Sequence, residues 1–245
     1  MARSRRTLGI LAGVAVVVLV IVGFGTWYLF IRDDAPEAAN IETAGETLDQ
    51  AGEGDEAAGA STLDGSWAVD TSVGSFDDFS GTWAGYRVDE ELASIGANTA
   101  VGRTPDVSGT MDVTGDEVTA VDVEVNMTTL QSDSGTRDGA MRSRGLETDQ
   151  FPTATFALSQ PVTLPSGLGE GGTASASATG NLTIHGVTKE VTLDVDVDLS
   201  GSTAAVVGQA PVTLSDFGIE PPTGFSVLSI NEQGTFEFQL FFTRQ

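Results

Sequence analysis

The chain has no cysteine, and its 245 residues include a single histidine, His185, and a single lysine, Lys189. The absence of cysteine excludes disulfides, thiol nucleophiles and an acyl anchor attached to cysteine. One histidine without a partner cluster supplies neither a zinc site nor a nucleophile–base pair. Phosphate-binding and serine-hydrolase motifs are also missing. We therefore expect no catalysis, no metal site and no cofactor.

Positive charge is scarce as well. Lysine and arginine together number 11 against 35 acidic residues, which gives a net charge of −24. Proteins that bind nucleic acid need a positive footprint for the phosphate backbone. The charge balance therefore excludes nucleic acid as a partner.

A long uncharged run stands near the start of the chain. Residues 8–31 read "LGILAGVAVVVLVIVGFGTWYLFI", and Arg3, Arg5 and Arg6 precede them. A helix of this length spans roughly 36 Å, enough to cross a hydrocarbon core of about 30 Å. The positive-inside rule places residues 1–7 in the cytoplasm and the rest outside. A cleaved signal peptide is the alternative, but its apolar region is normally shorter and ends at small residues.

Residues 32–64 are rich in Ala, Gly, Glu and Asp and poor in apolar side chains. Such a segment buries too little apolar surface to offset its ordering entropy. We expect a flexible, self-repelling tether between the plasma-membrane anchor and a domain at residues 65–245.

From residue 65 onward the apolar residues alternate with polar ones. "TAVDVEVNMTT", "EVTLDVDVDLSG" and "GTFEFQLFFTR" each place apolar side chains on one face and mostly polar ones on the other. Strict alternation is typical of half-buried antiparallel strands. Short turns at regular spacing predict an all-β up-and-down barrel or a sandwich. We find no amphipathic helix of sufficient length in this part of the chain, and residues 86–97 are the one doubtful stretch.

The one histidine falls between two such strands, in "NLTIHGVTKEVTL". Gly186 is free to adopt positive φ, so the pattern predicts a hairpin with His185 as a partly exposed turn residue. Asp194, Asp196 and Asp198 resemble the start of a calcium loop, but the valines between them indicate a solvated strand face.

Two long stretches carry a family resemblance. "GNLTIHGVTKEVTLDVDV" and "TTLQSDSGTRDGAMRSRGLETDQFPTATFAL" resemble the YceI-like proteins, the polyisoprenoid-binding family, and "GSWAVD" and "GTFEFQLFFTR" are similar to its first and last strands. The resemblance covers residues 65–245. An inserted stretch, "GYRVDEELASIGANTAVGRT", is similar to an actinobacterial branch. Thr71 and Ala140 stand where the family often has histidine, so no role of those histidines is carried over.

The resemblance implies a lipocalin-like antiparallel barrel of about eight strands that holds an isoprenoid-type lipid or quinone without catalysis. Inward-facing residues would then line the ligand cavity: Val123, Val125, Phe156, Leu193, Val195, Phe236 and Phe238. The alternative is that these side chains fill a solid core. In that case the protein would be a structural or interaction module of the cell envelope with a protein partner.

Arginines cluster between the two halves of the barrel sequence. Arg137 and Arg142 are candidates for contact with an anionic headgroup, because guanidinium groups bind phosphates in a bidentate manner. The alternative is that they neutralise neighbouring acids or pack the long loop. We expect Arg142 near the mouth of the cavity.

Overall fold

The computed structural model describes residues 35–52, 63–165, 168 and 172–245. Its strands are β1 (Gly65–Val69), β2 (Trp83–Leu92), β3 (Gly96–Thr104), β4 (Val107–Thr114), β5 (Glu117–Asn126), β6 (Gln131–Ser132), β7 (Thr153–Leu158), β8 (Val162–Thr163), β9 (Gly172–Ile184), β10 (Val187–Ser200), β11 (Thr203–Thr213) and β12 (Val227–Arg244). Its helices are α2 (Ile41–Gly52), α3 (Gly135–Ser143), η1 (Met127–Thr129) and η3 (Leu214–Phe217). None of these helices has the length and apolarity needed to cross a bilayer. The predictions for residues 1–7 and 8–31 concern residues outside the described ranges.

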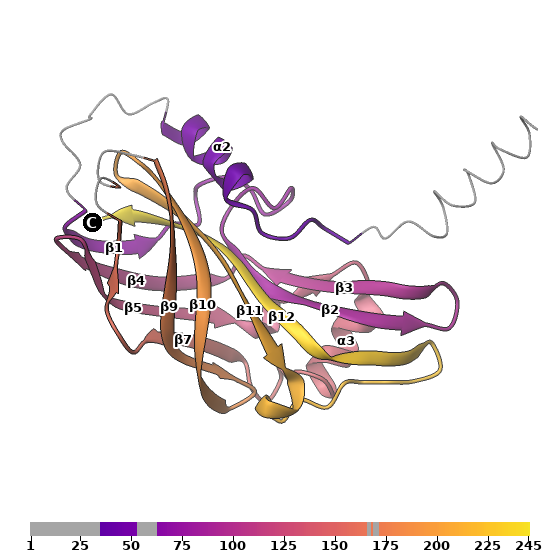
Figure 1. The fold of residues 1–245 in the computed structure, drawn as a ribbon. Helices are drawn as coiled ribbons and strands as arrows, with labels where there is room; N and C mark the ends of the chain where they lie inside the picture. The colour runs from indigo at the N-terminus through magenta and orange to yellow at the C-terminus, as the bar shows by residue number, and fades with distance from the viewer. Residues whose placement is uncertain (1–34, 53–62, 166–167, 169–171) are drawn as a thin grey trace, which may run out of the picture.

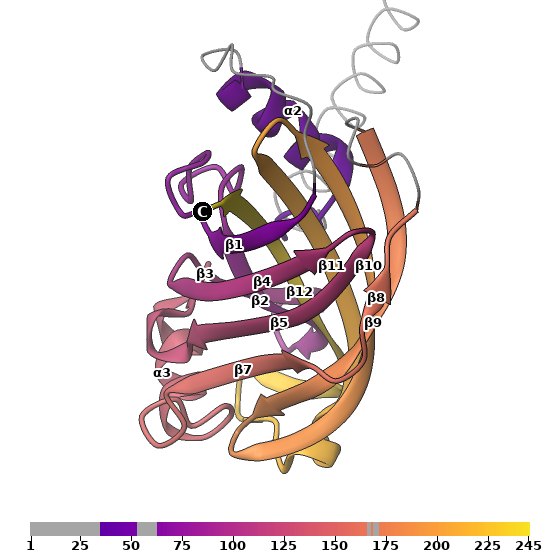
Figure 2. The same ribbon diagram turned by 90° about the vertical axis from the view of Figure 1, so that its left-hand side faces the viewer.

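Eight antiparallel strands form a closed barrel. Their order is β1-β4-β5-β7-β9-β10-β11-β12, and β12 pairs back with β1 through Trp67 opposite Arg244 and Val69 opposite Phe242. Figure 2 shows the strands curving round from β1 to β12. Of the two architectures that alternation and turn spacing left open, a barrel or a sandwich, the structure has the barrel that the family resemblance implies. Closure leaves these strands without free edges.

A second sheet region extends beyond the barrel, and we call it the wing. It consists of β2, β3 and residues 227–235 of β12 (Figure 1). The same edge of β12 pairs with β2 along the wing and with β1 where the barrel closes. The doubtful stretch at residues 86–97 thus belongs to the β2–β3 hairpin, whose strands are stabilised by pairing with β12.

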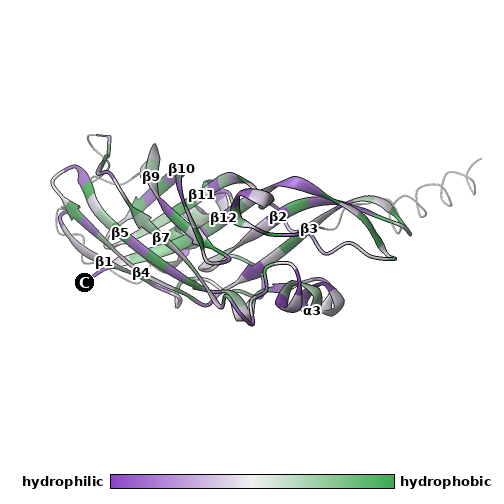
Figure 3. Cartoon of the chain, turned by 90° about the horizontal axis from the view of Figure 1, so that it is seen from below, coloured by the Kyte–Doolittle hydropathy of each residue, from purple (hydrophilic) through white to green (hydrophobic). Residues whose placement is uncertain are grey.

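The alternation predicted for β5, β10 and β12 is present in the structure. On the outer face of β9 and β10, cross-strand hydrogen bonds join Ser177 to Asp194 at 3.3 Å and Ser175 to Asp196 at 2.5 Å. Such opposed polar pairs stabilise a sheet face that meets water. Figure 3 shows hydrophilic and hydrophobic residues alternating along these strands. Asp194 and Asp196 thus lie on a solvated strand face, as predicted, whereas Asp198 is partly buried against α2.

The β9–β10 hairpin has the predicted turn. His185 and Gly186 both adopt positive φ, 53° and 72°, as a two-residue turn of this hand requires. The His185 ring contacts Glu147 Oε2 through Nε2 at 2.9 Å and the Phe217 carbonyl through Nδ1 at 3.2 Å, and it packs against Phe151. His185 is partly exposed, as expected. Its ring links the β9–β10 turn to the loop that contains Glu147 and Phe151 and to η3.

The expectation of a flexible tether is wrong for residues 35–52. Helix α2 packs on the outer face of the barrel, with Ala44 and Leu48 buried against Val207 and Phe241. Figure 1 shows α2 lying across one end of the barrel. The prediction failed because Ile41, Ala44 and Leu48 form one helical stripe, and the barrel offers outward apolar residues to cover it. Tertiary packing thus offsets the ordering entropy of an acidic segment.

A buried ion pair holds the chain that leads into α2. Arg103 donates to Glu237 at 2.8 Å, and Arg87 lies 3.3 Å from the same carboxylate. The two guanidinium groups also donate to the backbone carbonyls of Pro36 and Glu37. Hydrogen bonds from two arginines of the wing therefore hold residues 35–37 next to β2 and β3.

Candidate functional site

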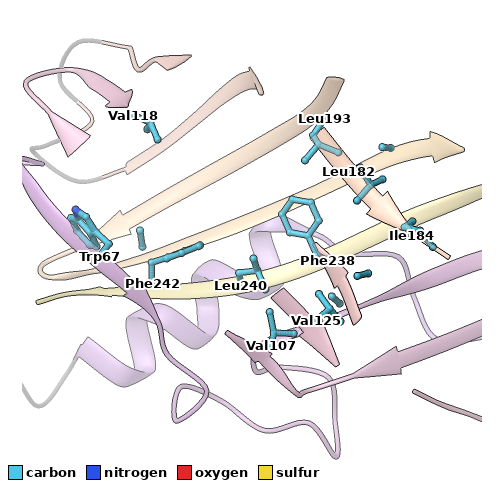
Figure 4. Packing of buried hydrophobic residues seen from close by; sticks show 14 of the residues in the cluster. Trp67, Val107, Val118, Val125, Leu182, Ile184, Leu193, Phe238, Leu240 and Phe242 are labelled. Carbon is cyan, nitrogen blue, oxygen red and sulfur yellow. The ribbon is translucent and has the colours of Figure 1, made fainter. Parts of the chain in front are cut away.

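The barrel encloses an apolar cavity of about 120 Å³. Its lining comprises Leu63, Trp67, Ala84, Met111, Val113, Val118, Val121, Val123, Val125, Ala154, Thr155, Phe156, Leu158, Val162, Leu164, Leu168, Ala176, Ala178, Leu182, Leu193, Val195, Val197, Leu199, Ala204, Val206, Phe236, Phe238, Leu240 and Phe242. The cavity has roughly ten times the space that one water molecule needs. Figure 4 shows part of the apolar packing that surrounds it.

Small residues on two strands keep the interior hollow. The inner face of β9 presents Ala176 and Ala178 where the neighbouring strand β10 presents Leu193 and Val195. The inner face of β11 likewise includes Ala204 among its lining residues. Methyl groups in place of larger side chains leave the space that a filled core would occupy. The centre of the barrel therefore contains apolar space, which fits a ligand cavity better than a completely filled core.

All seven residues predicted as cavity-lining face this space: Val123, Val125, Phe156, Leu193, Val195, Phe236 and Phe238. Several of them, including Val195 and Phe236, stay partly accessible although they point inward. Val125, Leu193 and Phe238 are buried in the same core. Their contact with a ligand stays a prediction.

The residues that line the cavity offer almost no hydrogen-bond partners to a water molecule. Thr155 is the one lining residue with a hydroxyl, and the indole Nε1 of Trp67 donates to the Leu63 carbonyl at 3.1 Å. A buried water needs two to four polar partners, and cavities lined by Leu, Val and Phe stay dry and take up apolar molecules. The cavity therefore favours a hydrocarbon occupant over water.

A second apolar cavity, of about 70 Å³, adjoins the first and was missed by sequence reasoning. The two share Ala84, Val125 and Phe236 as lining residues. The second cavity extends from the barrel to the underside of the wing, where it meets α3 and the segment before β12. No local pattern signals it, because its walls come from segments far apart in the sequence.

Arg137, a predicted headgroup contact, is engaged within the protein. Its guanidinium lies 2.6 Å from Glu90 of β2 and also pairs with Asp133. Burial lowers its pKa, but the hydrogen bond to Glu90 and the negative charges outweigh burial, so the net shift is upward. The ion pair fixes α3 to the wing. This geometry fits the alternative, neutralisation of acids, better than headgroup binding.

Arg142, the other predicted headgroup contact, is exposed at the end of α3. It borders a small recess together with Tyr86 and Met141, and both of these residues also line the second cavity. Among the described residues, no ion pair or hydrogen bond engages its side chain. Arg142 thus stands beside the second cavity with its charge available, and its role in binding stays a prediction.

In the part of the chain that the structure describes, no group of three or more His, Cys, Asp or Glu residues is placed to hold a metal ion. The apolar cavity is therefore the feature that defines the candidate site. An eight-stranded antiparallel barrel around an apolar cavity is the architecture of ligand-binding barrels.

The comparisons with known proteins then give the family. Residues 67–242 match the YceI-like domain, and the chain belongs to that family. A UPF0312 protein of Shewanella denitrificans is 30% identical over 177 residues, covering 67% of this chain and 88% of that protein. A UPF0312 protein of Pseudomonas aeruginosa is 30% identical over 159 residues, covering 58% and 79%.

Solved structures show the same fold. A polyisoprenoid-binding domain from Saccharophagus degradans, implicated in plant cell wall breakdown, aligns with a TM-score of 0.53 at 16% identity, covering 73% of this chain and 98% of that one. BcnA of Burkholderia cenocepacia aligns with a TM-score of 0.52 at 19% identity, covering 71% and 98%. At these identities the likeness concerns the fold alone.

Proposed function

We propose that this barrel binds the apolar chain of an isoprenoid-type amphiphile, a polyprenyl lipid or a quinone, without catalysing a reaction. The observation that carries the proposal is the apolar cavity, which offers hydrocarbon contacts and no partners for water. Each buried CH₂ group contributes about 0.8 kcal/mol, so a prenyl chain needs few polar contacts to bind. The structural likeness to a polyisoprenoid-binding domain supports the choice of ligand class.

The proposal includes a location at the outer face of the plasma membrane. The uncharged run at residues 8–31 and the arginines before it support an anchor with its N-terminus in the cytoplasm. An anchored barrel meets membrane lipids at a high effective concentration.

The test is native mass spectrometry of the full chain released from lipid nanodiscs, followed by organic extraction of what it carries. Ala178→Trp fills the cavity from β9, and Ser177→Trp, on the exposed outer face of the same strand, is the matched control. Loss of contacts to about two CH₂ groups costs roughly 1.6 kcal/mol, so Ala178→Trp should lower retention about tenfold or more. Ser177→Trp should leave retention unchanged.

Two results would count against lipid binding. Equal retention by Ala178→Trp and the parent would mean that lipid binds elsewhere. If the parent keeps the mass of the protein alone after incubation with polyprenyl lipids, it does not bind these lipids and the proposal is wrong. That second result would favour the envelope interaction module with a protein partner.

A further inference from the structure

The large exposed hydrophobic residues of the described ranges gather at one place. Ile95 is 49% exposed, Leu228 is 57% exposed, and Phe225 is fully exposed. Ile95 lies in the β2–β3 turn, and the other two flank the start of β12. Val227 pairs with Leu92, and the Ala93 amide donates to the Ser226 carbonyl at 3.0 Å, so the two segments meet. We call Ile95, Phe225 and Leu228 the wing tip.

The wing tip is free of charge in a strongly acidic chain. Residues 92–102 and 221–231 contain no Asp, Glu, Lys or Arg, whereas the whole chain carries a net charge of −24. Charged side chains normally keep exposed sheet ends apart from other surfaces. An uncharged apolar end with an exposed phenylalanine is suited to the interfacial region of a bilayer, where aromatic side chains are enriched.

Residues 35–37 lie beside this tip. Ala35 and Pro36 line the same surface groove as Ile95, and the backbone of Pro36 and Glu37 is held by Arg87 and Arg103. The uncharged run at residues 8–31 ends four residues before Ala35. Four residues span at most about 14 Å. If residues 8–31 cross the membrane, the wing is held close to its surface.

The second cavity leads from the wing toward the barrel. Its lining includes Pro221, Pro222 and Ile230, which belong to the segments that flank Phe225 and Leu228. At its other end it shares Ala84, Val125 and Phe236 with the barrel cavity. Apolar surface thus extends from near the wing tip to the barrel interior.

We propose that the wing tip inserts into the outer leaflet of the membrane that residues 8–31 span, so that the second cavity faces the bilayer and lipid enters the barrel beneath the wing. This inference rests on the proposed membrane anchoring and goes beyond it, because it fixes which end of the molecule touches lipid. The contact is apolar, so it does not require anionic headgroups.

The test uses the full chain in phosphatidylcholine vesicles with one fluorescent label. Because the chain has no cysteine, Ser226→Cys provides a single attachment site for an environment-sensitive dye at the wing tip. Thr114→Cys is the matched control, because Thr114 is the exposed last residue of β4 and the β4–β5 turn lies at the opposite end of the molecule (Figure 1). We expect a blue-shifted emission and quenching by brominated lipid at residue 226, and neither effect at residue 114. Phe225→Ser together with Leu228→Ser should abolish both effects at residue 226.

Flotation of the same vesicles tests membrane anchoring separately from the contact between the wing tip and lipid. If the chain floats but both labels report water, the wing-tip contact is wrong and anchoring stands. If the chain does not float, anchoring fails and the wing-tip proposal falls with it. A blue shift at residue 226 that requires high protein concentration and no lipid would identify a second copy of the chain as the partner and overturn the proposal.

Discussion

The Phe238 ring occupies the place that a side chain on Gly208 would take. The two residues are cross-strand partners on β12 and β11, and a Cβ atom at residue 208 would lie 2.4 Å from Cζ of Phe238. Phe156 on β7 lies equally close to Gly180 on β9, although its own cross-strand partner is Leu182: a Cβ atom at residue 180 would lie 2.4 Å from Cζ of Phe156. Each phenylalanine therefore lies against a bare backbone, which leaves the centre of the barrel open.

Gly208→Ala should push the Phe238 ring into the cavity, because the new methyl group would also meet Val195 at 3.0 Å. Overpacking of this kind lowers the free energy of unfolding by about 1–3 kcal/mol. Thermal melting and lipid extraction measure the two effects, and both stability and retention should fall. Gly139→Ala in α3 is the control, since no atom lies within 4 Å of its added Cβ. Equal retention by the two variants would contradict this account of the cavity.

Arg142→Ala should weaken binding of a polyprenyl phosphate by about tenfold, as expected for the loss of a hydrogen bond to a charged group. Binding of a neutral quinone should not change, because the arginine would contact only the headgroup. Titration of the full chain in nanodiscs with both ligands measures the difference. Arg144→Ala removes an equally exposed charge two residues away and should have no effect. Unchanged affinity of Arg142→Ala for the phosphate would exclude this residue from the site.

The contact between α2 and the barrel should weaken as pH rises. Partial burial and the nearby charge of Asp49 on α2 raise the pKa of Asp198 on β10. The charged form is thus disfavoured in the folded state, so its cost is present above the raised pKa and disappears as pH falls below it. Asp198→Asn should slow amide exchange in residues 41–52 at neutral pH and match the parent in acid.

The matched control for this prediction is Asp194→Asn on the exposed face of the same strand. The amide oxygen there can still accept the hydrogen bond from Ser177. Exchange in α2 should follow the parent at every pH. An identical pH response of the Asp198 and Asp194 variants would show that α2 docking does not depend on Asp198.

The sequence predicted the half-buried strands and their inward-facing residues because these depend on local alternation, whereas the choice of a barrel over a sandwich came from the family resemblance. Val123, Val195 and Phe238 lie at every-second-residue positions of β5, β10 and β12, so pairing of the strands brings them together without further information. The turn at His185 was equally local. These features required no knowledge of which distant segments meet.

The docking of α2 and the buried ion pair were missed because they depend on distant contacts. Two signals were nevertheless present. Adjacent apolar pairs, Val206-Val207 and Phe241-Phe242, indicate strands covered on both faces. The spacing of Ala44 and Leu48 indicates a helical stripe. By contrast, nothing near Arg103 in the sequence points to Glu237, 134 residues away.

The sharing of β12 between the barrel and the wing has a consequence for the order of folding. Closure of the barrel needs residues 242–244 to pair with β1, and the wing needs residues 227–239 to pair with β2. A ribosome delivers these residues after every other strand described here. Until then β1, β2 and β11 each have an unpaired edge, the kind of intermediate that aggregates readily. The barrel therefore cannot close before β12 is synthesised, and folding helpers would matter most in the period before that.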